Sequence, residues 1–285
     1  MSHAALPTLF LSHGSPMWAL EPGASGPALT RWAEGLRERL AAEGQPLRGI
    51  VLMSPHWMAR QPAVMTNAQP ATWHDFGGFP EPLYRLQYPA PGAPALAEHV
   101  LGLLQAAAVP AVPDAQRPLD HGAWVPLMHL LPQADVPVFQ VSLPARLDGA
   151  RAYAFGQALA PLAEEGVLIV GSGSLTHNLY EVRFDAAGAE GEDYALEFSA
   201  WITQAVLNRD HARLQQTMAI APHAQRAHPT PEHLWPLMVA AGAAGAEVPA
   251  KRIEGGITHG VLAMDSYLFG ALSLPASAAA DALAA

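Results

Sequence analysis

One stretch of the chain joins a strand-like apolar run to a glycine-rich segment and then to a histidine. It reads Gly166-Val167-Leu168-Ile169-Val170, then Gly171-Ser172-Gly173-Ser174, then Leu175-Thr176-His177-Asn178. The first part has the length and composition of a buried strand. The glycine-rich part could cradle a phosphate, but no lysine follows it, and Lys251 is the only lysine of the sequence. We therefore predict a tight turn at residues 171–174, whose glycines let the backbone bend and expose His177.

Two more histidines follow apolar runs in the same way. His13 comes directly after a strand predicted at residues 7–12, and His56 follows a strand predicted at residues 49–54. Ligand sites of α/β folds lie outside the carboxyl ends of the strands, so His13, His56 and His177 can meet there. Neutral imidazoles bind Zn, Fe, Cu and Ni. The sequence thus predicts a mononuclear metalloenzyme.

The fourth histidine motif has a different local structure and reads His228-Pro229-Thr230-Pro231-Glu232-His233. Thr230 is a good N-cap and Pro231 suits the first helical position, so we expect His233 in the first turn of a helix. The positive end of the helix dipole disfavours imidazolium and favours a neutral His233 that can bind metal. His228 is interpreted as a loop anchor, with metal binding as the alternative. Histidines outside these motifs are interpreted as structural or surface residues: His99, His129, His211 and His223.

The rest of the chain alternates helical and strand patterns. Helices are expected at residues 26–42, 93–108, 122–131, 150–165, 192–208 and 211–219. Further strands are expected at residues 136–143, 247–254 and 260–268. Such alternation predicts an α/β sandwich. We assign residues 1–272 to one catalytic domain and residues 273–285 to an Ala-rich tail.

A loop at residues 73–92 is rich in Gly and Pro and unusually long for a compact domain, which is typical of a functional lid or rim. Aromatic residues gather in it and near it, and we predict that they form a pocket rim for a planar substrate: Trp57, Trp73, Phe76, Phe79 and Tyr84.

Composition limits the function classes. With 285 residues and 51% hydrophobic content, the chain can bury one large core. The formal net charge of -10 opposes binding to nucleic acid. Because the sequence has no cysteine, any metal must be held by His, Asp or Glu. Residues 1–7 lack the features of a signal peptide and no apolar run could span a bilayer, so we expect a cytoplasmic monomer or small homo-oligomer without membrane contact.

Seven short motifs lie in order along nearly the whole chain. They are Ser12-His13-Gly14-Ser15-Pro16, Ser54-Pro55-His56-Trp57, residues 74–80, residues 88–92, Asp120-His121-Gly122-Ala123-Trp124, residues 171–178 and residues 228–233. Together they resemble the class III extradiol ring-opening dioxygenases, and among these most closely the 4,5-DOPA dioxygenase type. The resemblance implies a single-domain α/β fold around a mixed central β-sheet flanked by helices, with a metal pocket at the strand ends.

By this resemblance, His13, His56 and His233 would hold the metal, and His177 would be a fourth ligand or the acid/base. Related protocatechuate 4,5-dioxygenases use two His and one Glu, so Glu232 competes with His233 for the inner position. The DOPA-type pattern favours His233.

The resemblance also places His121 on the pocket wall. There it would stabilise negative charge on oxygen and donate a proton during ring opening. The alternative is a histidine that only fixes its loop by pairing with Asp120.

The implied activity is extradiol cleavage of a catechol by O2, such as 4,5-cleavage of L-DOPA. It would use one divalent metal ion, Fe(II) for the dioxygenase activity or Zn(II) as found. Rim residues such as His74, Tyr84 and Arg85 would select the catechol. The alternatives are a zinc-dependent hydrolase on the same scaffold and a non-catalytic metal-binding relative.

Overall fold

A six-stranded sheet with the order β6-β2-β8-β1-β12-β9 forms the centre of the computed structural model, which describes residues 5–184 and 191–270. Four neighbouring strands run parallel: β6 (Val138–Gln140), β2 (Gly49–Met53), β8 (Val167–Gly173) and β1 (Thr8–Ser12). The sheet continues through antiparallel pairings with β12 (Ser266–Phe269) and β9 (Ala250–Ile253). The prediction of an α/β domain with a mixed central sheet is confirmed.

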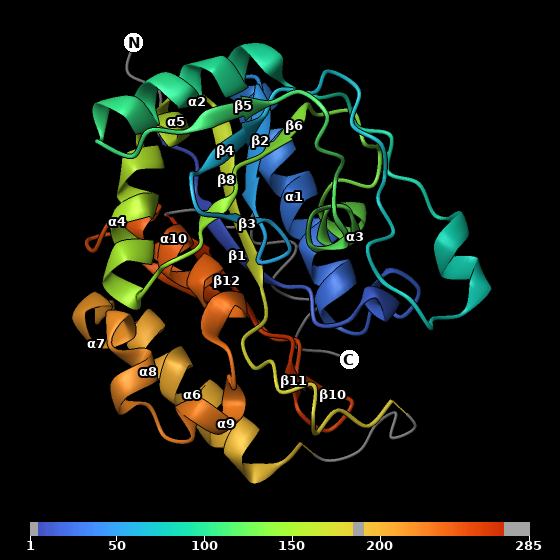
Figure 1. Ribbon diagram of the computed structural model, residues 1–285, viewed down its shortest axis with the longest axis vertical. Coiled ribbons are helices and arrows are strands. Elements are labelled where there is room, and N and C mark those ends of the chain that lie inside the picture. The colour runs from blue at the N-terminus through green and yellow to red at the C-terminus, as the bar shows by residue number, and fades with distance from the viewer. Residues whose placement is uncertain (1–4, 185–190, 271–285) are drawn as a thin grey trace.

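Helices cover both faces of this sheet. Figure 1 shows α1 (Ser25–Ala42) and α3 (His121–Leu130) on one side of the strands, and α4 (Gly149–Leu159) and α10 (Trp235–Ala244) on the other. Strands covered on both faces read as continuous apolar runs rather than as alternating patterns. The runs Leu9-Phe10-Leu11 and Ile50-Val51-Leu52 are fully buried in this way and belong to one core that the described residues share.

The remaining elements connect and flank this core. The helices are η1 (Pro16–Ala19), η2 (Glu81–Arg85), α2 (Pro94–Ala106), α5 (Pro161–Glu164), α6 (Asp193–Leu207), α7 (His211–Gln215), α8 (Thr217–Ile220), α9 (Ala224–Ala227) and η3 (Pro231–His233). Short strand pairs join β3 (Met58–Ala59) to β7 (Leu143–Pro144), β4 (Ala63–Met65) to β5 (Val112–Asp114), and β10 (Ile257–Thr258) to β11 (Leu262–Ala263). The predicted loop at residues 73–92 is irregular apart from η2 and an isolated bridge at Gly92.

Two predicted helices are each divided. The helix expected at residues 150–165 breaks into α4 and α5 because Pro161 has no N–H to continue the ladder. The helix expected at residues 211–219 breaks into α7 and α8. At the break, the Thr217 hydroxyl donates to the Leu214 carbonyl, which would accept from a backbone N–H in a continuous helix.

Two predicted strands are also divided. The strand expected at residues 136–143 ends at Gln140, since Val141 and Ser142 turn away to pair with the β4 segment. The strand expected at residues 260–268 separates into β11 and β12, which pair with different strands.

The prediction of a tight turn at residues 171–174 is wrong. β8 continues through Gly173, and neither Gly171 nor Gly173 has a positive φ. A Cβ on Gly171 would lie 2.1 Å from the carbonyl oxygen of Pro236, and one on Gly173 would lie 2.2 Å from that of His233. The glycines are needed because η3 and the start of α10 lie directly against the strand, not because the backbone bends.

The Ala-rich tail predicted at residues 273–285 lies outside the described residues, as do both ends of the domain range 1–272. Among the helices that the structure describes, none is both long and apolar enough to cross a lipid bilayer.

Candidate metal centre

Five histidines from five segments converge at the carboxyl ends of the parallel strands. His13 directly follows β1, and its N–H extends the sheet by donating to the Gly173 carbonyl at 2.8 Å. His56 lies in the turn after β2, where its N–H donates to the Ser54 hydroxyl at 3.2 Å. His177 lies in the loop after β8, where its N–H donates to the Ala227 carbonyl at 2.8 Å.

The other two histidines come from helices. His121 is the first residue of α3, and His233 is the last residue of η3, just before α10. As predicted, Thr230 is the N-cap residue, Pro231 opens the helical turn and His233 lies in that turn. The Thr230 hydroxyl donates to Glu232 at 2.9 Å and caps no backbone N–H. The helical turn is η3, a three-residue 3₁₀ turn that directly precedes α10.

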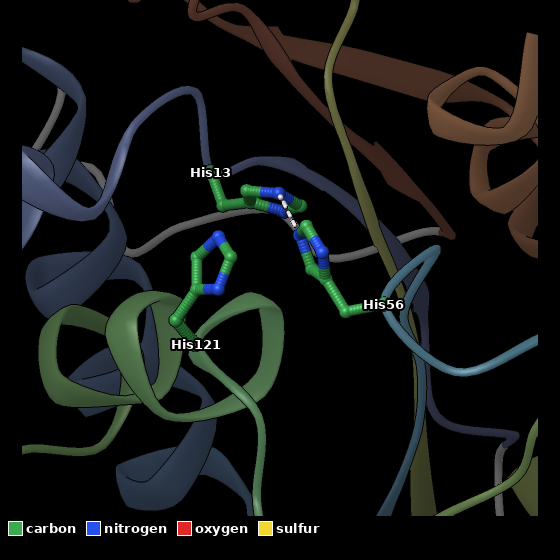
Figure 2. Close-up of side chains that lie close together, drawn as sticks. All are labelled: His13, His56 and His121. Carbon is green, nitrogen blue, oxygen red and sulfur yellow. Dashed lines mark hydrogen bonds between the residues drawn. The ribbon is translucent and has the colours of Figure 1, made fainter. Parts of the chain in front are cut away.

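The imidazole rings lie close together. Nε2 of His13 is 3.2 Å from Nε2 of His56, and Figure 2 shows both rings facing His121. The ring of His56 lies 4.0 Å from that of His121 and 5.2 Å from that of His233, measured between centroids. His177 stacks on His233 with centroids 3.4 Å apart. The structure therefore brings together all five histidines that the sequence singled out.

Nitrogen and oxygen atoms of these side chains form two groups with metal-ligand spacing. Ring nitrogens of His13, His56 and His121 lie within 4.8 Å of one another, and so do the ligand atoms of His177, Glu232 and His233. In the described part of the chain, Nε2 of His233 is buried and has no hydrogen-bond partner. A buried ring nitrogen without a partner is costly unless something else binds it.

Burial disfavours the charged form of four of these imidazoles by lowering their pKa values. It lowers the pKa of His56 to about 4, with the nearby His121 adding to the effect. Burial also lowers the pKa of His177 to about 4. The pKa values of His13 and His233 fall well below the ordinary range, because of burial first and then repulsion from the neighbouring histidines. Neutral imidazoles with free lone pairs are the form that binds a metal ion.

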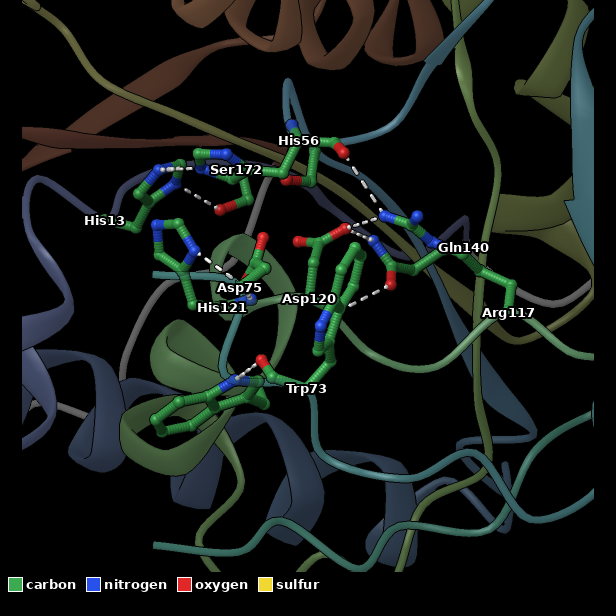
Figure 3. A network of polar contacts seen from close by, with 11 residues as sticks. His13, His56, Trp73, Asp75, Arg117, Asp120, His121, Gln140 and Ser172 are labelled. Carbon is green, nitrogen blue, oxygen red and sulfur yellow. Dashed lines mark hydrogen bonds and ion pairs between the residues drawn. The ribbon is translucent and has the colours of Figure 1, made fainter. Parts of the chain in front are cut away.

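Hydrogen bonds behind the rings fix their orientation. Nδ1 of His13 lies 2.9 Å from the Ser172 hydroxyl, which turns Nε2 toward the cluster (Figure 3). Nδ1 of His233 lies 3.2 Å from a carboxylate oxygen of Glu232. The structure thus gives His233 the interior position, with Glu232 behind it.

A mostly buried arginine, Arg117, holds the His56 turn. The guanidinium of Arg117 lies between Trp57 and Trp73, 4.7 Å and 5.0 Å from the ring centroids, and donates to the His56 carbonyl at 3.3 Å. It also donates to Asp120 at 2.8 Å. Cation–π contacts with two rings and an ion pair with a buried carboxylate leave Arg117 little freedom, so the turn is rigid.

Comparison with known proteins agrees with this geometry. The sequence model of a family described as "Catalytic LigB subunit of aromatic ring-opening dioxygenase" matches residues 7–266. The chain belongs to this family.

Several relatives of this dioxygenase are similar over nearly their whole length. The "4,5-DOPA dioxygenase extradiol" of Beta vulgaris is 41% identical over 263 residues, which cover 92% of this chain and 96% of the relative. The protein of the same name from Escherichia coli K12 is 34% identical over 273 residues, which cover 95% and 97%. A crystal structure of an uncharacterized protein from Escherichia coli K12 is similar with a TM-score of 0.70 and 28% identity, covering 93% of this chain and 100% of that one. The dioxygenase family that the seven motifs indicated is confirmed, and the chain is an enzyme of that class.

Aromatic residues of the dioxygenase line one side of the histidine cluster. Phe76 meets the ring of His121 edge-on at 5.5 Å, and Phe79 and Tyr84 pack on Phe76 at 5.4 Å and 5.3 Å. Phe184 extends the row by contacting Phe79 at 6.2 Å. Three of the predicted rim aromatics, Phe76, Phe79 and Tyr84, therefore gather beside the site.

Two other predicted rim residues, Trp57 and Arg85, lie elsewhere. Trp57 is only 8% exposed and packs under Arg117. The Arg85 side chain is 73% exposed and pairs with Glu81 in solvent. His74 remains next to the aromatic row, because its ring lies 5.8 Å from Phe76 and 5.9 Å from Tyr84 between centroids. Its Nε2 donates to the Leu86 carbonyl at 3.1 Å, which fixes the loop.

The histidines that the sequence assigned to structural roles make such contacts. His228 is buried and bonds from Nε2 to the Leu175 carbonyl at 2.9 Å, which is the predicted loop anchor. The other four contact partners away from the cluster: His99 with Glu165, His129 with the Trp18 carbonyl, His211 with Tyr153, and His223 with Glu197.

Sequence reasoning missed the partners of the cluster, namely Ser172, Arg117 and Asp75. Ser172 belongs to the glycine-rich segment that we interpreted as a turn, and Asp75 lies inside the aromatic loop. The acidic Asp75 among apolar residues was the available signal, because an isolated carboxylate in such a loop needs a buried partner.

Proposed function

We propose that this dioxygenase cleaves the ring of a catechol beside its diol, with 4,5-cleavage of L-DOPA as the representative reaction. Both atoms of O2 enter the product, a muconic semialdehyde-type compound, so no external reductant is needed. The observation that carries the proposal is the cluster of neutral, buried imidazoles in a family of ring-opening dioxygenases. The names of the relatives from Beta vulgaris and Escherichia coli support the DOPA-type substrate.

The residues fit one divalent metal ion. Nε2 of His13 and Nε2 of His56 face each other at 3.2 Å, and Nε2 of His233 is buried without a partner in the described residues. We assign these three nitrogens to the metal, with His177 beside them as a fourth ligand or the acid/base. When bound, the ion would supply Lewis acidity that favours loss of a proton from the catechol, and Fe(II) would also supply redox chemistry. Imidazole ligands suit Fe(II) and Zn(II) alike.

His177 and His121 carry the proton chemistry in this proposal. The neutral imidazole of His177 accepts the proton that the catechol hydroxyl loses. His121 lies on the side of the aromatic row, where its Nε2, when it carries a proton, stabilises negative charge on oxygen and donates that proton during ring opening. The aromatic row excludes water and favours a flat ring.

The decisive experiment removes the metal, reloads the protein with Fe(II) without oxygen, and then adds L-DOPA or another catechol with O2. Oxygen uptake equal to the catechol consumed, with a new yellow absorbance, is the expected result. No uptake across a catechol panel with confirmed Fe(II) occupancy would instead favour the zinc hydrolase.

Substitutions separate the proposed ligands from the proposed proton carriers. His13→Ala and His56→Ala should lose bound metal while keeping the fold, whereas His121→Ala should keep the metal and lose turnover. His177→Gln should lower turnover far more than catechol affinity. Metal content by elemental analysis decides the assignment, and loss of metal from His121→Ala would move His121 into the ligand set.

The cytoplasmic location and the monomeric or small homo-oligomeric state remain predictions from the sequence. Size-exclusion chromatography with light scattering measures the second of them.

A further inference from the structure

The N-terminus of α3 is capped by a residue from a distant loop. Asp120 occupies the N-cap position, yet its side chain caps no N–H of the helix and instead accepts from Arg117 and Gln140, each at 2.8 Å. The cap comes from Asp75, which lies 46 residues before His121 and accepts its backbone N–H at 2.9 Å. A carboxylate at this end of a helix also interacts favourably with the helix dipole.

The same carboxylate oxygen binds the imidazole. Oδ1 of Asp75 lies 2.9 Å from Nδ1 of His121, so one acceptor holds both the backbone and the ring of this residue (Figure 3). A carboxylate oxygen can only accept, so Nδ1 of His121 carries the proton. Nε2 is then the nitrogen left for the side of His13 and His56.

Packing leaves the ring no alternative orientation. The side chains of Asp75 and His121 are each 9% exposed. Phe76 meets the His121 ring edge-on at 5.5 Å, and the His56 ring lies 4.0 Å away on another side. Burial by itself would raise the pKa of Asp75, but the hydrogen bonds and charge of His121 outweigh it and lower that pKa. Asp75 is therefore an ionised carboxylate that acts on His121.

We propose that Asp75 is a positioning residue for the ring-opening reaction, which fixes His121 with Nδ1–H on the carboxylate and Nε2 toward the substrate. The catalytic part rests on the proposed function of His121, whereas the ring orientation does not. A freely rotating or wrongly protonated His121 would present a carbon or the wrong nitrogen to the substrate.

Two substitutions separate the negative charge of Asp75 from its role as a hydrogen-bond acceptor. Asp75→Asn keeps an oxygen that can accept both hydrogen bonds and removes the charge, whereas Asp75→Ala removes the acceptor. Asp75→Ala should lower kcat by about 10- to 100-fold, below the roughly 10²- to 10⁴-fold that a positioned acid or base itself contributes, with KM changed less than about 3-fold. Asp75→Asn should recover part of this loss, and metal content should stay unchanged in both variants.

A readout independent of turnover tests the orientation itself. In two-bond ¹H–¹⁵N spectra of the zinc-loaded protein, wild-type His121 should show a protonated Nδ1, and Asp75→Ala should lose that pattern. This measurement stands even if no catechol is cleaved, so failure of the proposed function and failure of this proposal are distinguishable.

The matched control is Asp148→Ala. Asp148 also caps a helix N-terminus, accepting the Arg151 N–H of α4 at 2.8 Å, but it is exposed and contacts no histidine of the cluster. Its loss should lower thermal stability as Asp75→Ala does and leave kcat and the His121 spectrum unchanged. A similar loss of kcat in Asp148→Ala would show that destabilisation alone explains the effect.

A double-mutant cycle completes the test. If Asp75 acts through His121, Asp75→Ala should have almost no further effect on kcat in a His121→Ala background. An additive loss in the double variant, loss of metal from Asp75→Ala, or an unchanged His121 spectrum in that variant would each overturn the proposal.

Discussion

Single residues of the cluster depend on partners that come from other elements. Ser172 of β8 binds His13, Arg117 binds the carbonyl of His56, and these contacts span 159 and 61 residues of sequence. Partners behind a ligand fix its orientation and raise its basicity. The cluster is therefore held as a unit by the sheet and the loops around it.

Ser172→Ala removes the hydroxyl that lies 2.9 Å from Nδ1 of His13 and creates little space. Because such partners typically contribute a factor of about 10 to 100, metal affinity should fall by that amount. Competition with a chromophoric chelator measures it. Ser142→Ala is the control, since the buried Ser142 hydroxyl accepts from the Ala63 N–H instead. Equal affinities in the two variants would contradict a role for Ser172.

At this scale the sequence predicted which histidines gather but not what holds them. Each of His13, His56 and His177 follows an apolar run, and that position is readable without coordinates. The partners Ser172, Arg117 and Asp75 are identifiable only when the folded chain brings distant segments into contact. No local pattern encodes such pairs.

Among the elements, the contact between β8 and the η3–α10 segment determines where His233 lies. The Ser174 N–H donates to the His233 carbonyl at 3.0 Å, and the strand has glycine wherever that segment comes nearest. Glycine at these positions therefore sets the distance between the strand and His233.

Gly173→Ala should displace His233, because the new Cβ would lie 2.2 Å from its carbonyl oxygen. Overpacking of this kind typically costs about 1–3 kcal/mol, and the displaced ring should also weaken metal binding. Urea unfolding and metal titration measure the two effects. Gly102→Ala in α2 is the control: nothing lies within 4 Å of its Cβ, so a helix-favouring gain of about 0.5–1 kcal/mol is expected. Normal metal binding by Gly173→Ala would disprove the displacement.

The sequence predicted most elements and missed where they break. Apolar periodicity located α1, α2, α3 and α6 to within a few residues. It could not show that residues 141–144 leave the sheet to pair elsewhere, because pairing partners are non-local. The glycines of β8 were misread for the same reason, since local sequence does not show what approaches a strand.

For the whole molecule, the buried histidines make stability depend on pH. Burial lowers the pKa of His228 from 6.5 to about 4, and it lowers the pKa values of His129 and His211 as well. Between pH 6.5 and about 4, the unfolded chain binds protons at these sites that the folded chain does not. The free energy of unfolding therefore decreases as the pH falls through this window.

His228→Gln should reduce this dependence, because glutamine can donate to the Leu175 carbonyl without titrating. Near pH 4, the substitution should abolish a loss of about 3 kcal/mol in the free energy of unfolding, by the conversion of 1.4 kcal/mol per pKa unit. Urea unfolding of metal-free protein at pH 7.5, 6 and 5 measures it, and the pH 7.5 value gives the structural cost of the substitution alone. A slope equal to that of the wild type would mean that His228 is protonated in the folded state.

The whole fold was more predictable than its details. Alternating helices and buried strands indicated the α/β class, and the order of seven motifs indicated the family before any coordinates. Strand order and the antiparallel position of β12 were not readable, since they depend on which distant strands exchange hydrogen bonds.

The Asp75 cap has a consequence for attempts to exchange parts between relatives. The loop that forms the aromatic wall of the site also caps the first turn of α3. A change in this loop therefore alters both the shape of the pocket and the orientation of His121. A chimaera that receives residues 75–79 from another enzyme to accept a new ring must bring an acceptor at the position of Asp75. Without it, the graft would change the orientation of the His121 imidazole along with the wall, and its altered selectivity would be misattributed to shape.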